Sequence, residues 1–232
     1  MPVGDEILGR LKKQYSVEAK EYVSLFAYLR SRDPFQVLVA TILSQNTTDK
    51  ASLEALNSLM KKVGLTPQAI LEAGKRRVQE AIKRAGMYRS KARFIIESSR
   101  IIMDKYGGSL RSLLEGDAET VRMRLEALPG VGGKTADVLL ATMGIVDTIP
   151  IDTHVRRVST RLGLIEDGMS YEEARKRLEE VFTIGSRHLA HLLLIAHGRK
   201  ICRARNPLCT DCTLRDLCRY YRETKSLLSG AA

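Results

Sequence analysis

Apolar residues recur along most of the chain at the three- and four-residue spacing of an α-helix. Short runs that alternate apolar and polar positions between turn residues, which are typical of strands, are nearly absent. The pattern therefore predicts an all-α fold built from roughly ten short helices.

The predicted helices have recognisable ends. Asp33-Pro34 places a capping side chain and a first-turn proline before a helix over Phe35–Leu43, and Thr66-Pro67 does the same for another helix. Gly86 and the pair Gly107-Gly108 are expected to end two more helices.

Two later helices also carry start signals. Asp117 is expected to cap a helix that runs through Leu128, and Ser170 with Glu173 predicts a capping box for a helix that runs through Phe182. No Pro- or Gly-rich linker, low-complexity segment or internal repeat interrupts the pattern. Any domain boundary is therefore expected between packed lobes.

Composition narrows the class of protein and of partner. Over 232 residues, 44% are hydrophobic, which is enough to form a buried core. Lysine and arginine outnumber aspartate and glutamate by 38 to 27, and the formal net charge of +11 suits nucleic acid or an anionic membrane surface. No apolar run approaches the roughly 20 residues of a membrane-spanning helix, and the N-terminus lacks a secretory apolar region. We expect a soluble intracellular protein.

A glycine-rich hairpin is predicted between two helical patterns, in the run Leu128-Pro129-Gly130-Val131-Gly132-Gly133-Lys134-Thr135-Ala136. Pro129 cannot continue the first helix, and the glycines permit a tight turn. The N–H groups that begin the second helix could hold a DNA phosphate without reading any base. An ordinary interhelical turn would have the same features.

The four cysteines lie in one C-terminal stretch, with six, two and five residues between successive members: Cys202, Cys209, Cys212 and Cys218. Disulfide frameworks usually spread along a secreted chain, so this clustering favours a metal site. Thiolates hold both zinc and [4Fe–4S] clusters. Zinc ribbons usually present two separated Cys-x-x-Cys pairs, whereas this chain has one.

The hairpin resembles that of the helix-hairpin-helix DNA glycosylase superfamily, and its lysine is similar to the endonuclease III branch in particular. The segment Ile151-Asp152-Thr153-His154-Val155 is similar to the family segment that carries a catalytic aspartate, and the cysteine spacing resembles the family's cluster loop. The resemblance runs from about Phe35 to Cys218. It implies that Lys134 and Asp152 are catalytic and that the four cysteines hold a structural [4Fe–4S] cluster. Taken alone, Asp152 could equally be a helix N-cap.

Two further segments resemble family loops that act on an extruded base. Leu43–Asp49 resembles the loop that fills the hole left in the duplex, and Gly86–Ala92 resembles the loop that wedges an apolar residue into the opposite strand. The DNA-binding residues implied in this way are Gln45 or Asn46 as the filler, Met87 as the wedge with Tyr88, and Leu128, Gly130, Val131 and Gly132 in the hairpin. A core methionine and a polar helix end are the alternative explanations.

This chain departs from the family pattern at two positions. Asn46 stands where glutamine is usual, and Gly133 stands where a basic residue is common. These departures leave the preferred lesion and the opposite base open. They do not alter the expected class of reaction.

The resemblance implies two helical lobes. One comprises residues 27–146 with the hairpin, and the other comprises residues 1–26 and 147–232 with the cluster loop at about 198–222. It also implies a bifunctional DNA glycosylase and AP lyase of base excision repair, which excises oxidised pyrimidines through a Schiff base on Lys134 followed by β-elimination. The expected partner is double-stranded DNA with damaged bases or abasic sites, and we expect a DNA-associated monomer.

Two other functions stay open. A monofunctional uracil or thymine-mismatch glycosylase would use a water activated by Asp152 and would not need Lys134. A non-catalytic helix-hairpin-helix DNA-binding protein would explain the charge and the hairpin. It gives no reason for Lys134 and Asp152 to occur together.

Overall fold

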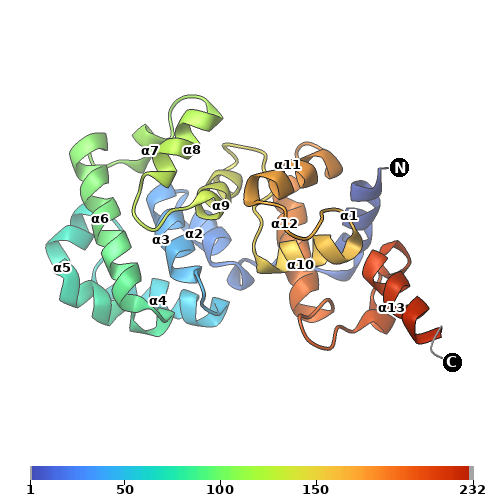
Figure 1. Cartoon of the computed structure of the whole chain (residues 1–232). Helices are drawn as coiled ribbons and strands as arrows, with labels where there is room; N and C mark the ends of the chain where they lie inside the picture. The colour runs from blue at the N-terminus through green and yellow to red at the C-terminus, as the bar shows by residue number, and fades with distance from the viewer. Residues whose placement is uncertain (1, 230–232) are drawn as a thin grey trace. The chain divides into compact units, whose positions relative to one another are not determined.

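The computed structural model describes residues 2–229 of the chain, with side chains up to Thr224. Within this range it contains thirteen α-helices and four short 3₁₀ helices and no strand, which confirms the predicted all-α fold (Figure 1). None of the helices in these residues is long and apolar enough to cross a membrane. The chain divides into two compact units, which we call unit 1 (residues 1–17 and 147–232) and unit 2 (residues 18–146).

Unit 2 is a continuous stretch of chain. Its elements are η1 (Ala19–Glu21), α2 (Val23–Ser31), α3 (Pro34–Ser44), α4 (Asp49–Lys62), α5 (Pro67–Ala81), η2 (Lys83–Ala85), α6 (Tyr88–Tyr106), α7 (Leu110–Leu113), α8 (Ala118–Glu126) and α9 (Gly133–Met143). Helix α3 is at the centre, because it packs against α2, α4, α6, α7 and α9 and is buried from Val37 to Leu43. The apolar residues of this helix leave no polar face for solvent.

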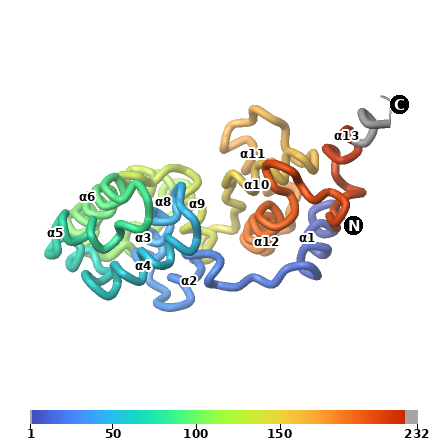
Figure 2. Tube along the Cα trace, turned by 90° about the horizontal axis from the view of Figure 1, so that it is seen from below, coloured from blue at the N-terminus to red at the C-terminus, as the bar shows by residue number. Residues whose placement is uncertain are grey.

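Unit 1 joins the N-terminal helix to the C-terminal part of the chain. Its elements are α1 (Val3–Gln14), α10 (Thr153–Leu162), α11 (Tyr171–Val181), α12 (Arg187–Lys200), η3 (Cys209–Asp211), η4 (Arg215–Leu217) and α13 (Arg219–Ser229). Helix α1 packs against α12, and both ribbon views show the two side by side (Figures 1 and 2). Helix α10 packs against α12 and α13.

The predicted helix starts are confirmed by their hydrogen bonds. The carboxylate of Asp33 accepts from the N–H of Phe35 at 3.0 Å, and the hydroxyl of Thr66 accepts from Ala69 at 3.1 Å. Asp117 caps α8, and Ser170 forms the predicted capping box at the start of α11. These contacts are local in sequence, which is why the sequence alone predicts them.

The first boundary between the units differs from the expected one. The units divide after Val17, whereas the sequence analysis placed residues 1–26 with the C-terminal lobe. Val23 and Ala27 are buried in the same hydrophobic core as α3 and α9, so α2 belongs to unit 2. The second boundary between the units lies between Val146 and Asp147.

Candidate functional site

The glycine-rich hairpin joins α8 to α9 in unit 2. Gly130 has a φ of 78°, and a Cβ at that position would lie 2.4 Å from the ring of Phe94, so only glycine fits there. The side chains of Leu128 and Val131 are buried in the hydrophobic core. The part of the hairpin that a phosphate could approach is therefore its backbone around exposed Gly132, which is also the N-cap of α9.

Lys134 is the second residue of α9 and is half-exposed. The helix is buried directly after it, from Thr135 to Thr142. The N–H groups of Thr135 and Ala136 both bond to the carbonyl oxygen of Gly132, at 2.9 and 3.0 Å, so the first turn is closed. A rigid first turn fixes the base of the Lys134 side chain beside the hairpin.

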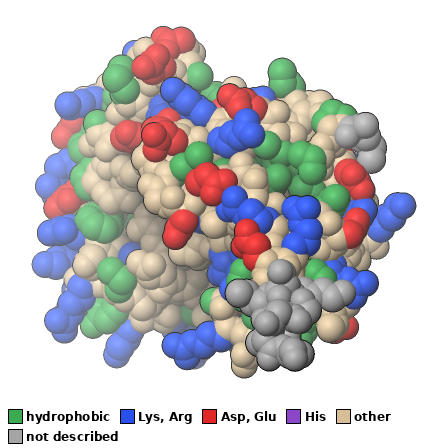
Figure 3. Space-filling model, turned by 45° about the vertical axis from the view of Figure 1, so that its right-hand side comes forward, with side chains coloured by type: hydrophobic (Ala, Val, Ile, Leu, Met, Phe, Trp, Pro, Cys, Tyr) green, Lys and Arg blue, Asp and Glu red, His purple; other side chains and the backbone are tan. Residues whose placement is uncertain are grey.

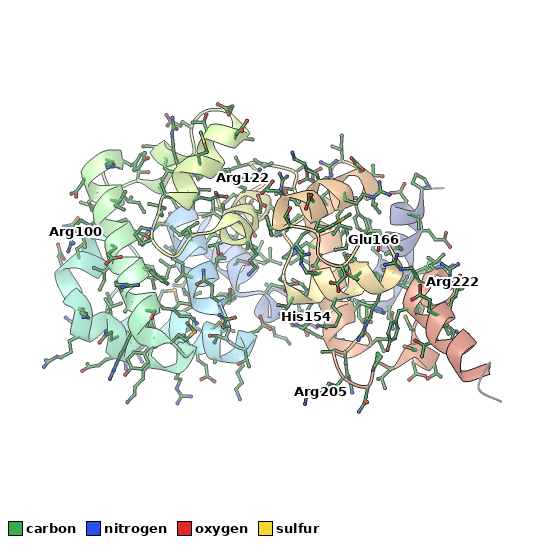
Figure 4. All side chains as sticks on the ribbon, viewed as in Figure 1. Arg100, Arg122, His154, Glu166, Arg205 and Arg222 are labelled. Carbon is green, nitrogen blue, oxygen red and sulfur yellow. The ribbon has the colours of Figure 1, made fainter. Side chains whose placement is uncertain are left out.

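An ion pair joins the two helices of the hairpin motif. Arg122 of α8 donates to a carboxylate oxygen of Asp137 on α9 from Nε, at 3.0 Å, and also from Nη2. The side chain of Asp137 is fully buried, and that of Arg122 is 17% exposed. Arg122 is labelled in Figure 4. The ion pair therefore holds α8 against α9 at Asp137, about one helical turn after Lys134.

The turn after α3 is tied to the hairpin by Gln45. Its side-chain amide donates to the carbonyl oxygen of Gly130 at 2.9 Å and to the hydroxyl of Thr135 at 3.1 Å. Asn46 is exposed and has a left-handed φ of 49°. The two candidate filler residues therefore differ, because Gln45 braces the hairpin while Asn46 faces solvent.

The candidate wedge loop lies between η2 and α6. Met87 is 61% exposed, so it is not a core methionine, and its φ of 42° is left-handed. Tyr88 begins α6, is partly buried against the core of unit 2, and has the guanidinium of Arg89 5.8 Å from its ring centre. An exposed apolar side chain on a turn suits insertion between bases.

Asp152 is the N-cap of α10 in unit 1, as the sequence analysis expected for its structural alternative. Its carboxylate accepts from the N–H of Val155 at 2.7 Å, and the residue is half-buried. His154, which is labelled in Figure 4, follows on the first turn, where its Nδ1 lies 3.1 Å from a guanidinium nitrogen of Arg157. Burial lowers the pKa of His154, and the carboxylate of Asp152 opposes that shift. One carboxylate oxygen of Asp152 accepts the capping hydrogen bond, and the second oxygen takes no part in the cap.

The second half of α10 holds the start of the cysteine loop. Arg157 donates to the carbonyl oxygens of Cys202 and Gly198, at 2.9 and 2.8 Å. Arg161 donates to the carbonyl oxygen of Arg203 at 2.7 Å and approaches the sulfur of Cys202 at 3.4 Å. One helix thus carries Asp152 at its N-terminus and anchors the loop through its C-terminal half.

The four cysteines line a single pocket, together with residues of α10, α12 and α13. Between residues 2 and 229, no three His, Cys, Asp or Glu side chains are grouped to hold one metal ion. Burial raises the pKa of the Cys212 thiol to about 11, and the other three cysteines add to this rise. Deprotonation of four thiols in this lining would require a cationic centre between them, which is what a thiolate-bound metal group would supply.

A buried hydrogen-bonded pair supports the cavity wall. The hydroxyl of Tyr15, from the N-terminal segment, lies 3.0 Å from Nδ1 of His197, and Nε2 of that histidine lies 3.5 Å from the sulfur of Cys212. The ring of His197 is 2% exposed, and burial lowers its pKa to about 4. The neutral ring is therefore the favoured form at neutral pH.

Several residues that shape the site were not predicted from the sequence: Thr47, Lys91, Arg122, Asp137, Arg157 and Arg161. One signal was available for Lys91, which stands one helical turn before Ile95 on the apolar stripe of α6. A charged residue on a buried stripe indicates a specific partner. The others pair with residues distant in sequence, and no local pattern indicates such partners.

The comparisons with known proteins agree on one family. Residues 39–183 match the model of the HhH-GPD superfamily base excision DNA repair proteins. Endonuclease III of Sulfolobus acidocaldarius is 38% identical over 222 residues, which cover 95% of this chain and 97% of that protein.

Two solved structures are similar along almost the whole chain. A non-covalent endonuclease III–DNA complex has a TM-score of 0.80 and 31% identity, and covers 97% of this chain and 100% of that one. A trapped endonuclease III–DNA covalent intermediate has a TM-score of 0.77 and 32% identity with the same coverage. The chain described here belongs to the endonuclease III family of the HhH-GPD superfamily of base excision DNA repair proteins.

Proposed function

We propose that this protein releases damaged bases from duplex DNA as a glycosylase and then cleaves the strand at the resulting abasic site as a lyase. The observation that carries the proposal is Lys134 on the first turn of α9, directly after a hairpin with a close-approach glycine, in a chain of the endonuclease III family. A related protein of known structure has been trapped as a covalent intermediate with DNA. A covalent adduct requires a nucleophile on the protein.

Lys134 is the proposed nucleophile. Its Nζ, after losing a proton, attacks the sugar C1′ while the bond from C1′ to the base breaks and the base leaves with a proton. The sugar ring then opens to a Schiff base between C1′ and Nζ. Loss of a proton from C2′ breaks the bond from C3′ to the phosphate oxygen, and water finally releases the lysine. The strand is cut without hydrolysis of a phosphate ester.

Asp152 is the proposed electrostatic and proton-transfer partner. Its carboxylate is fixed by the cap bond to Val155, so one orientation is maintained without substrate. A fixed carboxylate stabilises the positive charge that develops on the sugar as the base leaves. It can also accept a proton during the reaction.

Double-stranded DNA is the proposed partner. The net charge of +11 favours a polyanion, and Lys and Arg side chains are spread over the face shown in Figure 3, interspersed with Asp and Glu. The backbone near Gly132 offers an N-cap to a phosphate. We propose that the protein acts as a monomer, with the oxidised pyrimidine as its lesion.

A [4Fe–4S] cluster is the proposed occupant of the cysteine cavity. Cys202, Cys209, Cys212 and Cys218 would be its ligands, since all four line the same cavity. Such a centre would fix the shape of the loop by joining four points of it. Protein prepared without oxygen should be brown, absorb broadly at roughly 400 nm and contain about four irons per chain. Stoichiometric zinc with no visible absorption would contradict the assignment.

Borohydride trapping tests the proposed reaction. Reduction during turnover on a lesion duplex should give a covalent protein–DNA adduct, because a Schiff base is reducible whereas a water-mediated path forms none. Lys134→Gln should abolish both the adduct and base release while binding to abasic-site DNA persists. Lys105→Gln, on the exposed end of α6, is the matched control and should react like the wild type.

A panel of duplexes separates the remaining functions. Each duplex carries one oxidised pyrimidine, one uracil or one thymine opposite guanine, and base release and strand cleavage are scored separately. Base release without cleavage, retained in Lys134→Gln, would replace the proposal with a monofunctional glycosylase. Asp152→Asn keeps the cap and should lower base release by a factor on the order of 10²–10⁴.

A further inference from the structure

Lys91 is a buried cation in the middle of unit 2. It lies on the first turn of α6, and its side chain is 2% exposed. Its Nζ donates to the carbonyl oxygen of Leu43 at 2.8 Å, to the carbonyl oxygen of Ala85 at 2.6 Å and to the hydroxyl of Thr47 at 2.5 Å. The three protons of an ammonium group thus have three acceptors.

The acceptors come from two separate turns. Leu43 and Thr47 flank the turn after α3, which contains Gln45 and Asn46. Ala85 is the last residue of η2 and directly precedes the turn with Gly86 and Met87. Lys91 therefore bonds to both of the turns that resemble the loops acting on an extruded base.

Thr47 joins the same two turns a second time. Its hydroxyl accepts from Lys91 and lies within hydrogen-bond distance of the carbonyl oxygens of Gln45, at 3.0 Å, and of Ala85. The hydroxyl has one proton, so it donates to one of these carbonyls at a time. The lysine and the threonine thus form one small hydrogen-bond network that joins the two turns.

Each of the two turns contains a residue with an energetically unfavourable backbone conformation. Asn46 and Met87 are non-glycine residues with a positive φ, at 49° and 42°. Such conformations persist where the surrounding structure determines them, and they concentrate at functional sites. The carbonyl groups bonded to Lys91 stand close to both residues along the chain, so the network supplies that support.

We propose that Lys91 is a positioning residue that holds, together with Thr47, the Asn46 turn and the Met87 turn as one rigid element for displacing a base. The inference rests on the proposed function, because it assigns a purpose to the two turns. Insertion of a wedge and a filler is more favourable when both side chains are already ordered before DNA binds. A lysine that served folding alone would stabilise unit 2 without coupling the two turns.

Hydrogen exchange on the protein without DNA tests the coupling. Lys91→Met and Thr47→Val should each speed exchange of the hydrogen-bonded amides of both turns together, at residues 45 and 47 and at residues 85 and 91, because the opening of one turn frees the other. Lys91→Arg should restore part of the protection, and Lys105→Met is the control on the same helix. Faster exchange in only one turn would overturn the inference. Thr47→Val decides the matter if Lys91→Met does not fold, because it only replaces one hydroxyl with a methyl group of similar size.

A double variant with Met87, the proposed wedge, tests whether Lys91 acts on base displacement. Lys91→Met should lower the single-turnover rate of base release by up to about 100-fold, since misplacement by about 1 Å has that effect, while abasic-site DNA binding stays near that of the wild type. Met87→Ala should add little further loss in the Lys91→Met background, because both act on one step. Independent, multiplicative losses would overturn the inference. A wild type that releases no base refutes the proposed function, and hydrogen exchange still decides the coupling.

Discussion

Gln45 donates a hydrogen bond of 2.9 Å to the carbonyl oxygen of Gly130, from the end of α3 to the tip of the hairpin. Its amide also reaches Thr135 on the first turn of α9 at 3.1 Å. One side chain thus fixes the hairpin from both sides of its glycine-rich turn. Asn46, the next residue, has an exposed side chain.

This difference predicts separate effects for the two candidate filler residues. Gln45→Leu should lower the free energy of unfolding by about 1–3 kcal/mol, because the Gly130 carbonyl loses its donor. Asn46→Gly should leave stability nearly unchanged, since glycine accepts the left-handed φ, while base release falls. Urea denaturation and single-turnover excision measure the two effects. Equal stability in both variants would contradict the bracing role of Gln45.

Two of the hairpin glycines, Gly130 and Gly132, should respond in opposite ways to substitution by alanine. Gly130→Ala should destabilise the protein by roughly 2–4 kcal/mol, because its Cβ would overlap Phe94 at a positive φ. Gly132 has a φ of −106° and no atom within 4 Å of a Cβ, so Gly132→Ala should fold normally. DNA affinity should nevertheless fall in Gly132→Ala, because the methyl group keeps a phosphate from the backbone. Thermal unfolding and equilibrium DNA binding separate the two results.

The ion pair between Arg122 and Asp137 predicts unequal single variants. Arg122→Met should cost about 3 kcal/mol or more, because it deprives a fully buried carboxylate of its guanidinium partner. Asp137→Asn should cost less, since Arg122 is partly exposed and water can solvate it. The double variant Arg122→Met/Asp137→Asn should therefore be more stable than Arg122→Met alone. Denaturant unfolding of the three variants measures these losses in unfolding free energy. A loss in the double variant equal to the sum of the two single losses would contradict the predicted coupling.

The cysteine loop predicts a charge-specific effect on DNA binding. Arg205 is exposed on the loop, and its side chain points away from the unit (Figure 4). If it contacts a phosphate, Arg205→Ala should reduce the log–log salt slope of duplex binding by about 0.9. Arg100→Ala removes another exposed charge, from α6, and should leave the slope unchanged. Identical slopes for wild type and both variants would remove the loop from the proposed interface.

Lys91 predicts a rise in stability at alkaline pH. Burial lowers its pKa to about 8 from the usual 10.5. The folded protein therefore releases this proton at lower pH than the unfolded chain does. Between about pH 8 and 10.5 the unfolded state binds more protons, so the contribution of Lys91 to stability increases with pH, by up to about 3 kcal/mol. The difference in unfolding free energy between wild type and Lys91→Met should grow over this range. A difference in unfolding free energy that stays constant over this pH range would contradict the lowered pKa of Lys91.

The sequence predicted features whose partners are close along the chain. The capping residues Asp33 and Ser170 bond within three positions of themselves, so residue type and spacing suffice. The family motifs likewise identified the hairpin and the four cysteines. All these signals are short segments with definite residue types.

Features that depend on distant partners were not predicted. Lys91 bonds to a carbonyl 48 positions earlier, and Arg122 pairs with an aspartate across a hairpin. The first boundary between the units differs from the expected one for the same reason, since α2 is assigned by the core that buries Val23 and Ala27. Because every residue has a backbone carbonyl group, residue type does not indicate which carbonyl oxygen accepts a given hydrogen bond.

The position of α1 has a consequence for synthesis of the chain. Arg10 pairs with Asp216 at 2.5 Å and Tyr15 bonds to His197, so the first helix has its partners near the other end of the chain. Unit 2 is continuous and needs neither end. On the ribosome, unit 2 can fold as soon as it emerges, while α1 waits for the segments that carry His197 and Asp216. The cysteine loop is thus completed after unit 2, and nascent chains cut short before Cys218 would carry a finished hairpin without a complete four-cysteine loop.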